Sequence, residues 1–257
     1  MTASAKKWLS EGLEETGRIA LLLGETARSL VTQRLNWRDL VHQLHFIGVK
    51  SQSVVLITGA FTGMVLCAQA YFQFHKVKMD TATLAVVSVS MCSELGPVLT
   101  ALMVAGRVGA AIAAELGTMR VTEQIDALRT LATHPVDYLV VPRLVATIVA
   151  LPLLTVEAIV IGIGAGYWVA VHLLNIDASY SWANMIKYSD GVDVVIGFTK
   201  ALIFGALVAL LSCYKGMNCS EGAEGVGRAT TEAVVFSSIA ILITNFFLTL
   251  FLTRVFS

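Results

Sequence analysis

The sequence predicts an all-α integral membrane protein, and three observations support that prediction. Hydrophobic residues make up 56% of the 257 positions and charged residues only 14%, whereas charged residues reach about a quarter in soluble domains. The mean hydropathy is +0.75. Apolar runs of the ~20 residues that a bilayer crossing requires recur along the chain. We therefore expect about five transmembrane helices, an N-terminal interfacial helix and a short charged helix in a cytoplasmic loop.

Residues 1–50 form an N-terminal segment that we expect in the cytoplasm or the membrane interface. Charges interrupt its apolar stretches, so it lacks the pattern of a secretory signal. Apolar side chains recur at helical spacing at Trp37, Leu40, Val41, Leu44 and Ile47. This pattern predicts an amphipathic helix lying in the membrane interface, with a soluble partner as the alternative surface for its apolar face.

Residues 51–257 form the transmembrane domain, whose crossings are predicted from its apolar runs. These runs are residues 54–74, 84–105, 144–174, 194–214 and 233–255. The third run exceeds one crossing and contains Pro152 and Glu157, so we expect it to be tilted, broken or extended. An odd number of crossings places the two ends of the chain on opposite sides of the membrane.

Basic residues predict which end is cytoplasmic. Most of the 18 Lys and Arg residues lie in the N-terminal segment, in the loop after the second run and in the loop before the fifth. The positive-inside rule then places the N-terminus in the cytoplasm and the C-terminus outside, although Lys76 and Lys78 oppose this orientation. Acidic residues also number 18, so the net charge indicates no nucleic-acid-binding surface.

An acidic residue within the second run, Glu94, is the strongest sign of function. A carboxylate at the bilayer centre costs about 2.5–3.5 kcal/mol on insertion scales, so such residues usually face a cavity, a partner or a substrate path. The following Gly96-Pro97 pair removes a backbone donor and crowds the preceding turn. We therefore expect an irregular helix beside a buried acid. An interhelical hydrogen bond or a neutral buried carboxyl group is the structural alternative.

The loop of residues 106–142 has the composition of a helix rather than of a flexible linker. Helix-forming and charged residues fill positions 115–129, with apolar side chains about one turn apart. Thr118 or Thr122 is expected to cap the start of this helix, and His134-Pro135 to end it. Such a helix could receive force from a motor protein or could be a solvated connector, and the residues leave both interpretations open.

Two more charged residues lie within apolar runs, Glu157 in the third and Lys200 near the outer end of the fourth. A pair between them would require a tilted third helix, because a rise of 1.5 Å per residue puts them at different depths. We assign neither a role. Gly59 and Gly63 have G-x-x-x-G spacing, which permits close helix approach but is a weak signal alone.

The sequence does not indicate an enzyme or a metal site. The four cysteines form no C-x-x-C pair, so neither a zinc site nor a disulfide framework is predicted. No G-x-x-x-x-G-K-[ST] phosphate loop occurs, so ATP hydrolysis would belong to another polypeptide. No nucleophile, base and orienting group form a recognisable catalytic set. We expect no catalytic residue, metal or cofactor in this chain.

Several motifs closely resemble the MlaE (YrbE-type) permease family. They are Gly59-Ala-Phe-Thr-Gly63, the run from Glu94-Leu-Gly-Pro97 to Gly106-Arg107-Val-Gly109, and the run from Ala114-Glu115 to Gln124-Ile-Asp126. The resemblance continues through His134-Pro135 and Leu151-Pro152 to Gly227-Arg228. It therefore covers nearly everything after the N-terminal segment.

The resemblance implies the permease subunit of an ABC transporter that moves phospholipid between inner and outer membranes and maintains outer-membrane lipid asymmetry. Members of that family work as homodimers in the inner membrane, which implies a periplasmic C-terminus here. The implied partners are a cytoplasmic ABC ATPase (MlaF-like) that uses the ATP, a hexamer of MCE-domain proteins (MlaD-like) and a STAS-domain protein (MlaB-like).

The resemblance also implies roles for single residues. The implied lipid-binding residues are Glu94, Leu66, Tyr71, Phe74, Val77 and Pro97. A coupling helix within residues 115–131 would contact the ATPase, and its implied contact residues are Glu115, Met119, Arg120, Glu123, Asp126 and Leu128. Ser93 replaces an arginine that many relatives carry, so any head-group recognition that depends on that arginine must be met differently.

Two other functions are compatible with the residues. A stand-alone proton-coupled secondary transporter of a lipid-like or apolar substrate would use Glu94 and Glu157 as a proton relay. Such proteins commonly contain internal repeats, and no convincing repeat is found here. A scaffold that holds an ATPase at the membrane would require the 115–131 segment and would tolerate loss of Glu94.

Overall fold

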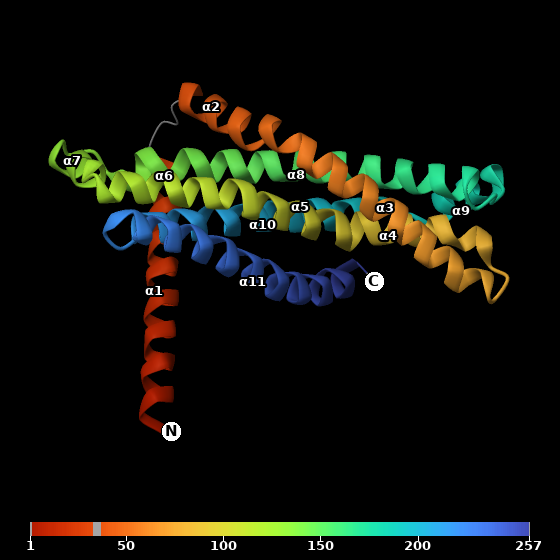
Figure 1. Ribbon diagram of the computed structural model, residues 1–257, viewed down its shortest axis with the longest axis horizontal. Helices are drawn as coiled ribbons and strands as arrows, with labels where there is room; N and C mark the ends of the chain where they lie inside the picture. Colours follow the sequence, from red (N-terminus) through yellow and green to blue (C-terminus); the bar gives the residue numbers. More distant parts are fainter. Residues whose placement is uncertain (1, 33–36, 257) are drawn as a thin grey trace.

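The computed structural model describes residues 2–32 and 37–256 and shows an elongated helical bundle (Figure 1). Among these residues there is no strand, and five helical runs are long and apolar enough to cross a membrane. They are Trp37–His75, Asp80–Val121, Val136–His172, Gly191–Met217 and Gly222–Val255. Each coincides with one of the predicted apolar runs, which confirms an all-α membrane protein with five spans.

Several spans are built from more than one helical segment. The α-helices are α1 Thr2–Thr32, α2 Trp37–Ile47, α3 Gln52–His75, α4 Thr83–Ser90, α5 Gly96–Val104, α6 Ala110–Val121, α7 Gln124–Thr130, α8 Val141–His172, α9 Ala178–Tyr188, α10 Gly191–Met217 and α11 Gly222–Phe256. Turns of 3-10 helix lie at Val49–Ser51 and Asp80–Ala82, and wider π turns lie at Met91–Leu95, Ala105–Gly109 and Val136–Val140. The second span is thus a continuous helical run in which π turns join α4, α5 and α6.

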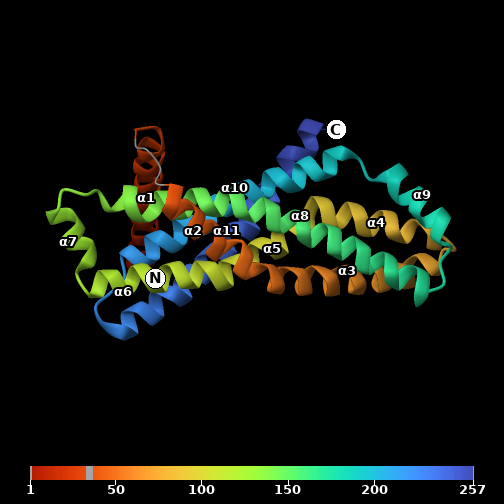
Figure 2. The same cartoon turned by 90° about the horizontal axis from the view of Figure 1, so that it is seen from above.

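Helix α8 lies at the centre of the bundle. It packs against α3 on one side and α10 on another, and α2 and α5 also contact it. Its 32 residues extend about 48 Å at 1.5 Å per residue, which exceeds the ~30 Å hydrocarbon core. Helix α7 lies at one end of the bundle and α9 at the other (Figures 1 and 2). We call these the α7 end and the α9 end.

The N-terminal segment forms two helices, of which the sequence analysis anticipated one. Helix α2 begins at Trp37 as predicted, but only the turn Val49–Ser51 separates it from α3, and Leu40 and Ile47 are buried. Its location in the membrane interface stays a prediction. Helix α1 crosses the bundle at a steep angle near the α7 end (Figure 1). A helix at this angle lies along the membrane surface when the bundle stands upright in a bilayer.

Small residues allow α3 and α8 to touch through their backbones. A Cβ atom built on Gly59 would lie 2.8 Å from the carbonyl oxygen of Ala158, and one built on Gly63 would overlap the backbone of Gly162. Gly166 continues this contact and faces the carbonyl oxygen of Gly63. The G-x-x-x-G spacing at residues 59–63 is therefore a packing motif between two helices of the same chain.

Substitution Gly63→Ala should lower the stability of the bundle, because the added methyl group has no space between α3 and α8. Overpacking of this kind costs about 1–3 kcal/mol, which thermal unfolding of the purified protein in detergent would measure. Gly164→Ala is the matched control on α8, since no atom lies within 4 Å of a Cβ built there. Equal melting temperatures for the two variants would contradict the backbone contact.

Candidate functional site

The backbone around Glu94 departs from a regular α-helix at the position where Pro97 requires it. In the π turn Met91–Leu95, the amide of Gly96 donates to the carbonyl oxygen of Met91. Pro97 has no N–H group, so the carbonyl oxygen of Ser93, four residues earlier, receives no α-helical hydrogen bond from it. The ammonium group of Lys200 donates to this oxygen at 3.0 Å. The expected irregularity at Gly96-Pro97 is confirmed, and it supplies an acceptor for a side chain of another span.

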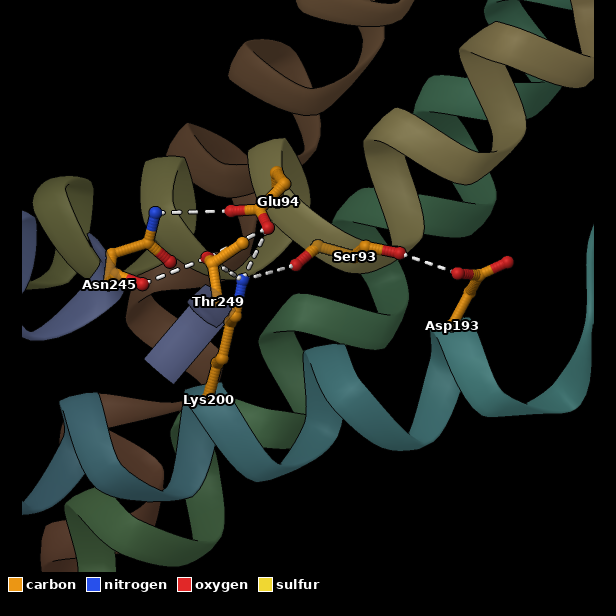
Figure 3. A network of polar contacts seen from close by, with 6 residues as sticks. All are labelled: Ser93, Glu94, Asp193, Lys200, Asn245 and Thr249. Carbon is orange, nitrogen blue, oxygen red and sulfur yellow. Dashed lines mark hydrogen bonds and ion pairs between the residues drawn. The ribbon is translucent and has the colours of Figure 1, made fainter. Parts of the chain in front are cut away.

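Lys200, in α10, is completely buried, and its ammonium group has three hydrogen-bond acceptors (Figure 3). Besides Ser93, these are Oε1 of Glu94 at 2.6 Å and Oγ1 of Thr249 at 2.8 Å. An ammonium group carries three protons, so every donor is satisfied. Without these partners a buried cation would be strongly unfavourable in a low-dielectric interior.

Glu94 accepts hydrogen bonds on both carboxylate oxygens. Oε1 receives Lys200 and lies 2.9 Å from Oγ1 of Thr249, and Oε2 accepts from the side-chain amide of Asn245 at 3.1 Å (Figure 3). The Glu94 side chain is 36% exposed, in contrast to 0% for Lys200. We call Glu94, Lys200, Asn245 and Thr249 the polar cluster. It joins the second, fourth and fifth spans, and the Glu94 side chain is its partly exposed member.

Two polar groups adjoin the polar cluster. Oδ1 of Asn245 is buried and has no hydrogen-bond partner among the described residues. The hydroxyl group of Ser93 donates to Oδ1 of Asp193 at 2.8 Å, and Asp193 forms a capping box with Asp190 at the start of α10. Ser93 is thus bound to a carboxylate of the fourth span.

Glu157 and Lys200, to which the sequence analysis assigned no role, have different partners. Lys200 binds Glu94, and Glu157 accepts a hydrogen bond from the side-chain amide of Gln52 at 3.0 Å. Lys200 lies in the third turn of α10, which begins at the α9 end of the bundle.

The other implied lipid-binding residues do not join the polar cluster. Leu66 and Tyr71, on α3, are partly buried and pack on a separate group of apolar side chains near the α9 end. Phe74 is in the last turn of α3, and Val77, in the turn after it, is 62% exposed. Pro97 is buried in the first turn of α5. Their contact with lipid stays a prediction.

The single helix expected over residues 115–129 is wrong in its extent. Glu115, Met119 and Arg120 belong to α6, which continues the second span, whereas Asp126 and Leu128 belong to the separate helix α7. The chain turns between them at Glu123, whose φ of 59° lies in the left-handed region. A short helix is therefore present within 115–131, but it begins only at Gln124.

The expected N-terminal cap of this helix also needs correction, and two of its charged residues bind each other. Thr118 and Thr122 do not cap α7, because their hydroxyl groups donate to carbonyl oxygens one turn earlier, at Ala114 and Thr118. Nη1 of Arg120 binds Asp126 at 2.7 Å, which ties α6 to α7. Several of the implied coupling residues thus hold the turn together.

Glu115 is paired within the chain to a residue that the sequence analysis did not select. Nη2 of Arg143, in the first turn of α8, binds Oε1 of Glu115 at 2.9 Å, and Nη1 donates to the carbonyl oxygen of Leu139 at 2.6 Å. The Arg143 side chain is 5% exposed. This ion pair joins α6 to α8 at the base of the segment that contains α7.

Sequence reasoning found Glu94 but not most of its partners. Asn245 and Thr249 are polar residues one turn apart within the apolar fifth run, which is a usable signal because polar groups in lipid need partners. Asp193 and Arg143 lie near the ends of spans, where charges are common, so no local signal marks them. The described residues contain no group of three His, Cys, Asp or Glu side chains that could hold a metal ion.

Known proteins resemble this chain over most of its length. The family model for permease MlaE matches residues 40–251. A probable ABC transporter permease protein of Rickettsia conorii is 44% identical over 236 residues, which cover 92% of this chain and 91% of the relative. The intermembrane phospholipid transport system permease protein MlaE of Haemophilus influenzae is 37% identical over 213 residues, 82% and 81% of the two chains. The chloroplastic protein TRIGALACTOSYLDIACYLGLYCEROL 1 of Arabidopsis thaliana is 34% identical over 248 residues, 96% and 70%.

Substitution Lys200→Met should destabilise the protein, because it leaves the Glu94 carboxylate without its cation. Removal of one partner of a buried ion pair costs about 3–5 kcal/mol. The double variant Glu94→Gln with Lys200→Met should recover most of this loss, since it removes both charges together. Thermal unfolding in detergent measures both effects. A double variant that is as unstable as Lys200→Met would contradict the pairing.

Proposed function

Because this chain belongs to the MlaE permease family, we propose that it is the membrane-spanning subunit of an ABC transporter that moves phospholipid between an inner and an outer membrane. Such transport would maintain the lipid asymmetry of the outer membrane. The name of the Rickettsia relative supports an ABC transporter permease, and that of the Haemophilus relative supports phospholipid as the cargo. The structural observation that carries the proposal is the polar cluster, which holds a partly exposed carboxylate within the spans.

The polar cluster suits a site where a lipid head group passes an otherwise apolar wall. Lys200 is enclosed and holds Glu94 in place, so the partly exposed Glu94 side chain is the group that a head group would meet. Glu94 would therefore contact cargo directly, and Lys200 would be a positioning residue.

Helix α11 supports a homodimer whose interface encloses the polar cluster. Asn245 and Thr249 of this helix bind Glu94. Four phenylalanine and leucine side chains of the same region are more than half exposed, namely Phe246, Phe247, Leu250 and Phe251. A second copy packed on this surface would place two polar clusters next to one shared cavity.

An ATPase in a separate polypeptide would act on the α7 end. Helix α7 projects beyond the spans, and only Ile125 of its residues is buried. Its neighbours α6 and α8 are held together by Arg143 and Glu115. Displacement of α7 by ATPase closure would therefore move the second and third spans together. An MCE-domain hexamer on the α9 side and a STAS-domain protein on the ATPase complete the proposed assembly.

The proposed mechanism follows from the continuity of the second span. The helical run Asp80–Val121 contains both Glu94 and the end of α6. Movement at the α7 end reaches Glu94 along this helix, and the π turn beside Gly96-Pro97 is the place where it can bend. The cavity then binds lipid with different affinity in its two conformations, which transport requires. Lipid passes between the cavity and the MCE tunnel.

The proton-coupled alternative receives less support from the contacts. Glu94 is bound to a lysine, and Glu157 is bound to Gln52. Among the described residues no hydrogen bond links the two acids, so a relay between them would need water molecules. Lipid transfer that persists without ATP would favour this alternative.

We place the α7 end in the cytoplasm and the α9 end in the periplasm of an inner-membrane protein. The charge asymmetry of the sequence supports this orientation. Labelling of a cysteine placed at exposed Ser220, at the α7 end, by an impermeant reagent in intact cells would contradict it.

The double variant Glu94→Gln with Lys200→Met should abolish ATP-dependent lipid transfer in a reconstituted complex, although it folds. The physical reason is the loss of the Glu94 carboxylate, which contacts the head group, and of the Lys200 ammonium group, which positions that carboxylate. Transfer of fluorescent phospholipid between donor and acceptor vesicles measures the rate. Thr199→Ala is the control, because its hydroxyl group binds only the carbonyl oxygen of Val195 within α10. Wild-type transfer by the double variant would refute the role of the polar cluster.

Substitution Ala127→Arg should prevent an ATPase from co-purifying with this chain, because it puts a long charged side chain on the exposed face of α7. Gentle affinity purification from native membranes, followed by mass spectrometry of the bound proteins, measures the loss. Ser179→Arg at the exposed α9 end is the control and should retain the ATPase. Retention by both variants would exclude α7 as the docking site.

A further inference from the structure

Arg107 is a cation near the membrane that no carboxylate neutralises. It lies in the π turn Ala105–Gly109, and Nη1 donates to the hydroxyl oxygen of Ser51 at 2.6 Å. Five other arginines each bind an aspartate or glutamate, namely Arg18, Arg120, Arg129, Arg143 and Arg228. Among the described residues, Arg107 therefore keeps a positive charge that a neutral hydroxyl group does not balance.

The guanidinium group of Arg107 is not closed off by its surroundings. Arg107 is half-buried. The Nε atom of Arg143 is buried and has no hydrogen-bond partner, whereas this is not so for the Nε and Nη2 atoms of Arg107. Gly106, beside it, is exposed, and a Cβ built there would meet no atom within 4 Å. Two donor atoms of Arg107 can thus be reached from outside the bundle.

The depth of Arg107 matches a layer of lipid head groups. Glu94 comes about 11 residues after the start of α4, or about 16 Å along the helix, which puts it near the middle of a ~30 Å hydrocarbon core. Arg107 is 13 residues farther toward the α7 end, or about 20 Å. It therefore lies just past the hydrocarbon boundary, at the level of phosphates.

Two irregular backbone segments meet at this position. Ser51 ends the 3-10 turn between α2 and α3, and Arg107 is the middle residue of a π turn in the second span. Single π turns often occur at functional sites. Exposed Val49 and exposed Lys50 come directly before Ser51 in the chain, so an apolar side chain and a second positive charge belong to the turn that Arg107 contacts.

We propose that Arg107 binds the phosphate group of a glycerophospholipid in the leaflet at the α7 end, while buried Ser51 holds one end of its guanidinium group. A guanidinium group binds phosphate through paired hydrogen bonds, and basic pockets beside membrane helices bind anionic head groups. The site is separate from the polar cluster. The membrane depth and the apolar neighbours favour a lipid over free phosphate as the source of the anion. The inference does not depend on transport or on an ATPase.

Native mass spectrometry of the purified full chain tests this site. The delipidated protein is titrated with dioleoyl phosphatidylglycerol, with dioleoylglycerol, which has no phosphate, and with inorganic phosphate. We expect adducts with phosphatidylglycerol only, and a loss of affinity of about tenfold or more in Arg107→Gln, because hydrogen bonds to a charged group are lost. Equal binding of dioleoylglycerol, or displacement of the lipid by inorganic phosphate, would overturn the proposal.

Ser51→Ala separates a binding role of Arg107 from a purely structural one. This variant removes the protein partner of Arg107 but leaves the guanidinium group, so it should still bind phosphatidylglycerol with less than threefold change. If the contact only holds helices together, Arg107→Gln and Ser51→Ala should lower the melting temperature equally and leave lipid binding unchanged, which would refute the site.

Two further variants complete the test. Arg228→Gln removes an exposed arginine that already has Glu232 as its partner, and it should bind phosphatidylglycerol as the wild type does. Should Arg107→Gln fail to fold, Arg107→Lys keeps the charge but loses the paired geometry, and its affinity should fall by a smaller factor. Wild-type affinity in the lysine variant would count against paired binding of phosphate.

Discussion

The enclosed ammonium group of Lys200 is the constraint on which the centre of the bundle depends. A charge at this depth is tolerated only when its protons all have acceptors. Each acceptor comes from another span: Glu94 and the Ser93 carbonyl oxygen from the second, and Thr249 from the fifth. The position of α10 therefore determines the positions of the two spans beside it. Pro97 contributes through a missing hydrogen bond, because it leaves the Ser93 oxygen free for Lys200.

Close backbone packing complements this polar constraint on the other side of the second span. The glycine contacts between α3 and α8 bring two helices together without side chains between them. Gly96 belongs to the same packing, since a Cβ there would lie 2.5 Å from Cγ1 of Ile159 in α8. The segment that carries Glu94 is thus held by hydrogen bonds on one face and by steric fit on the other. Within this segment, the backbone departs from regular α-helical geometry at the π turn Met91–Leu95.

Charged groups divide the second span into levels with different tasks. Glu94 is balanced by Lys200 in the middle of the span, and Glu115 by Arg143 near its end. Arg107, between them, has only a neutral partner. A charge that is balanced within the chain holds the bundle together, whereas one that is not balanced attracts an external ion. This contrast separates the structural ion pairs from the proposed head-group site, although all lie on one continuous helical run.

The sequence by itself determined the class of fold, the five spans and the importance of Glu94. These follow from local properties, because the length of an apolar run and the presence of a carboxylate within it can be recognised without reference to distant residues. Motif resemblance gave the family before any contact was known. Helix α7 begins later than the composition of residues 115–129 suggests, because a left-handed residue at Glu123 interrupts a sequence with uniform helix propensity. Helix α1 was not anticipated, because charges interrupt the apolar stretches of its sequence.

Only the tertiary structure decided which charges meet. The sequence analysis assigned Lys200 no partner, since the sequence does not give the rotation or the neighbour order of the spans. Folding put Glu94, 106 positions away in the chain, within 2.6 Å of the ammonium group. Folding likewise brought Arg143 to Glu115, and it brought Arg107 to a hydroxyl group rather than to a carboxylate. Pairing in a membrane bundle depends on which helix faces are adjacent, and packing at backbone contacts such as Gly63 with Gly162 establishes that arrangement.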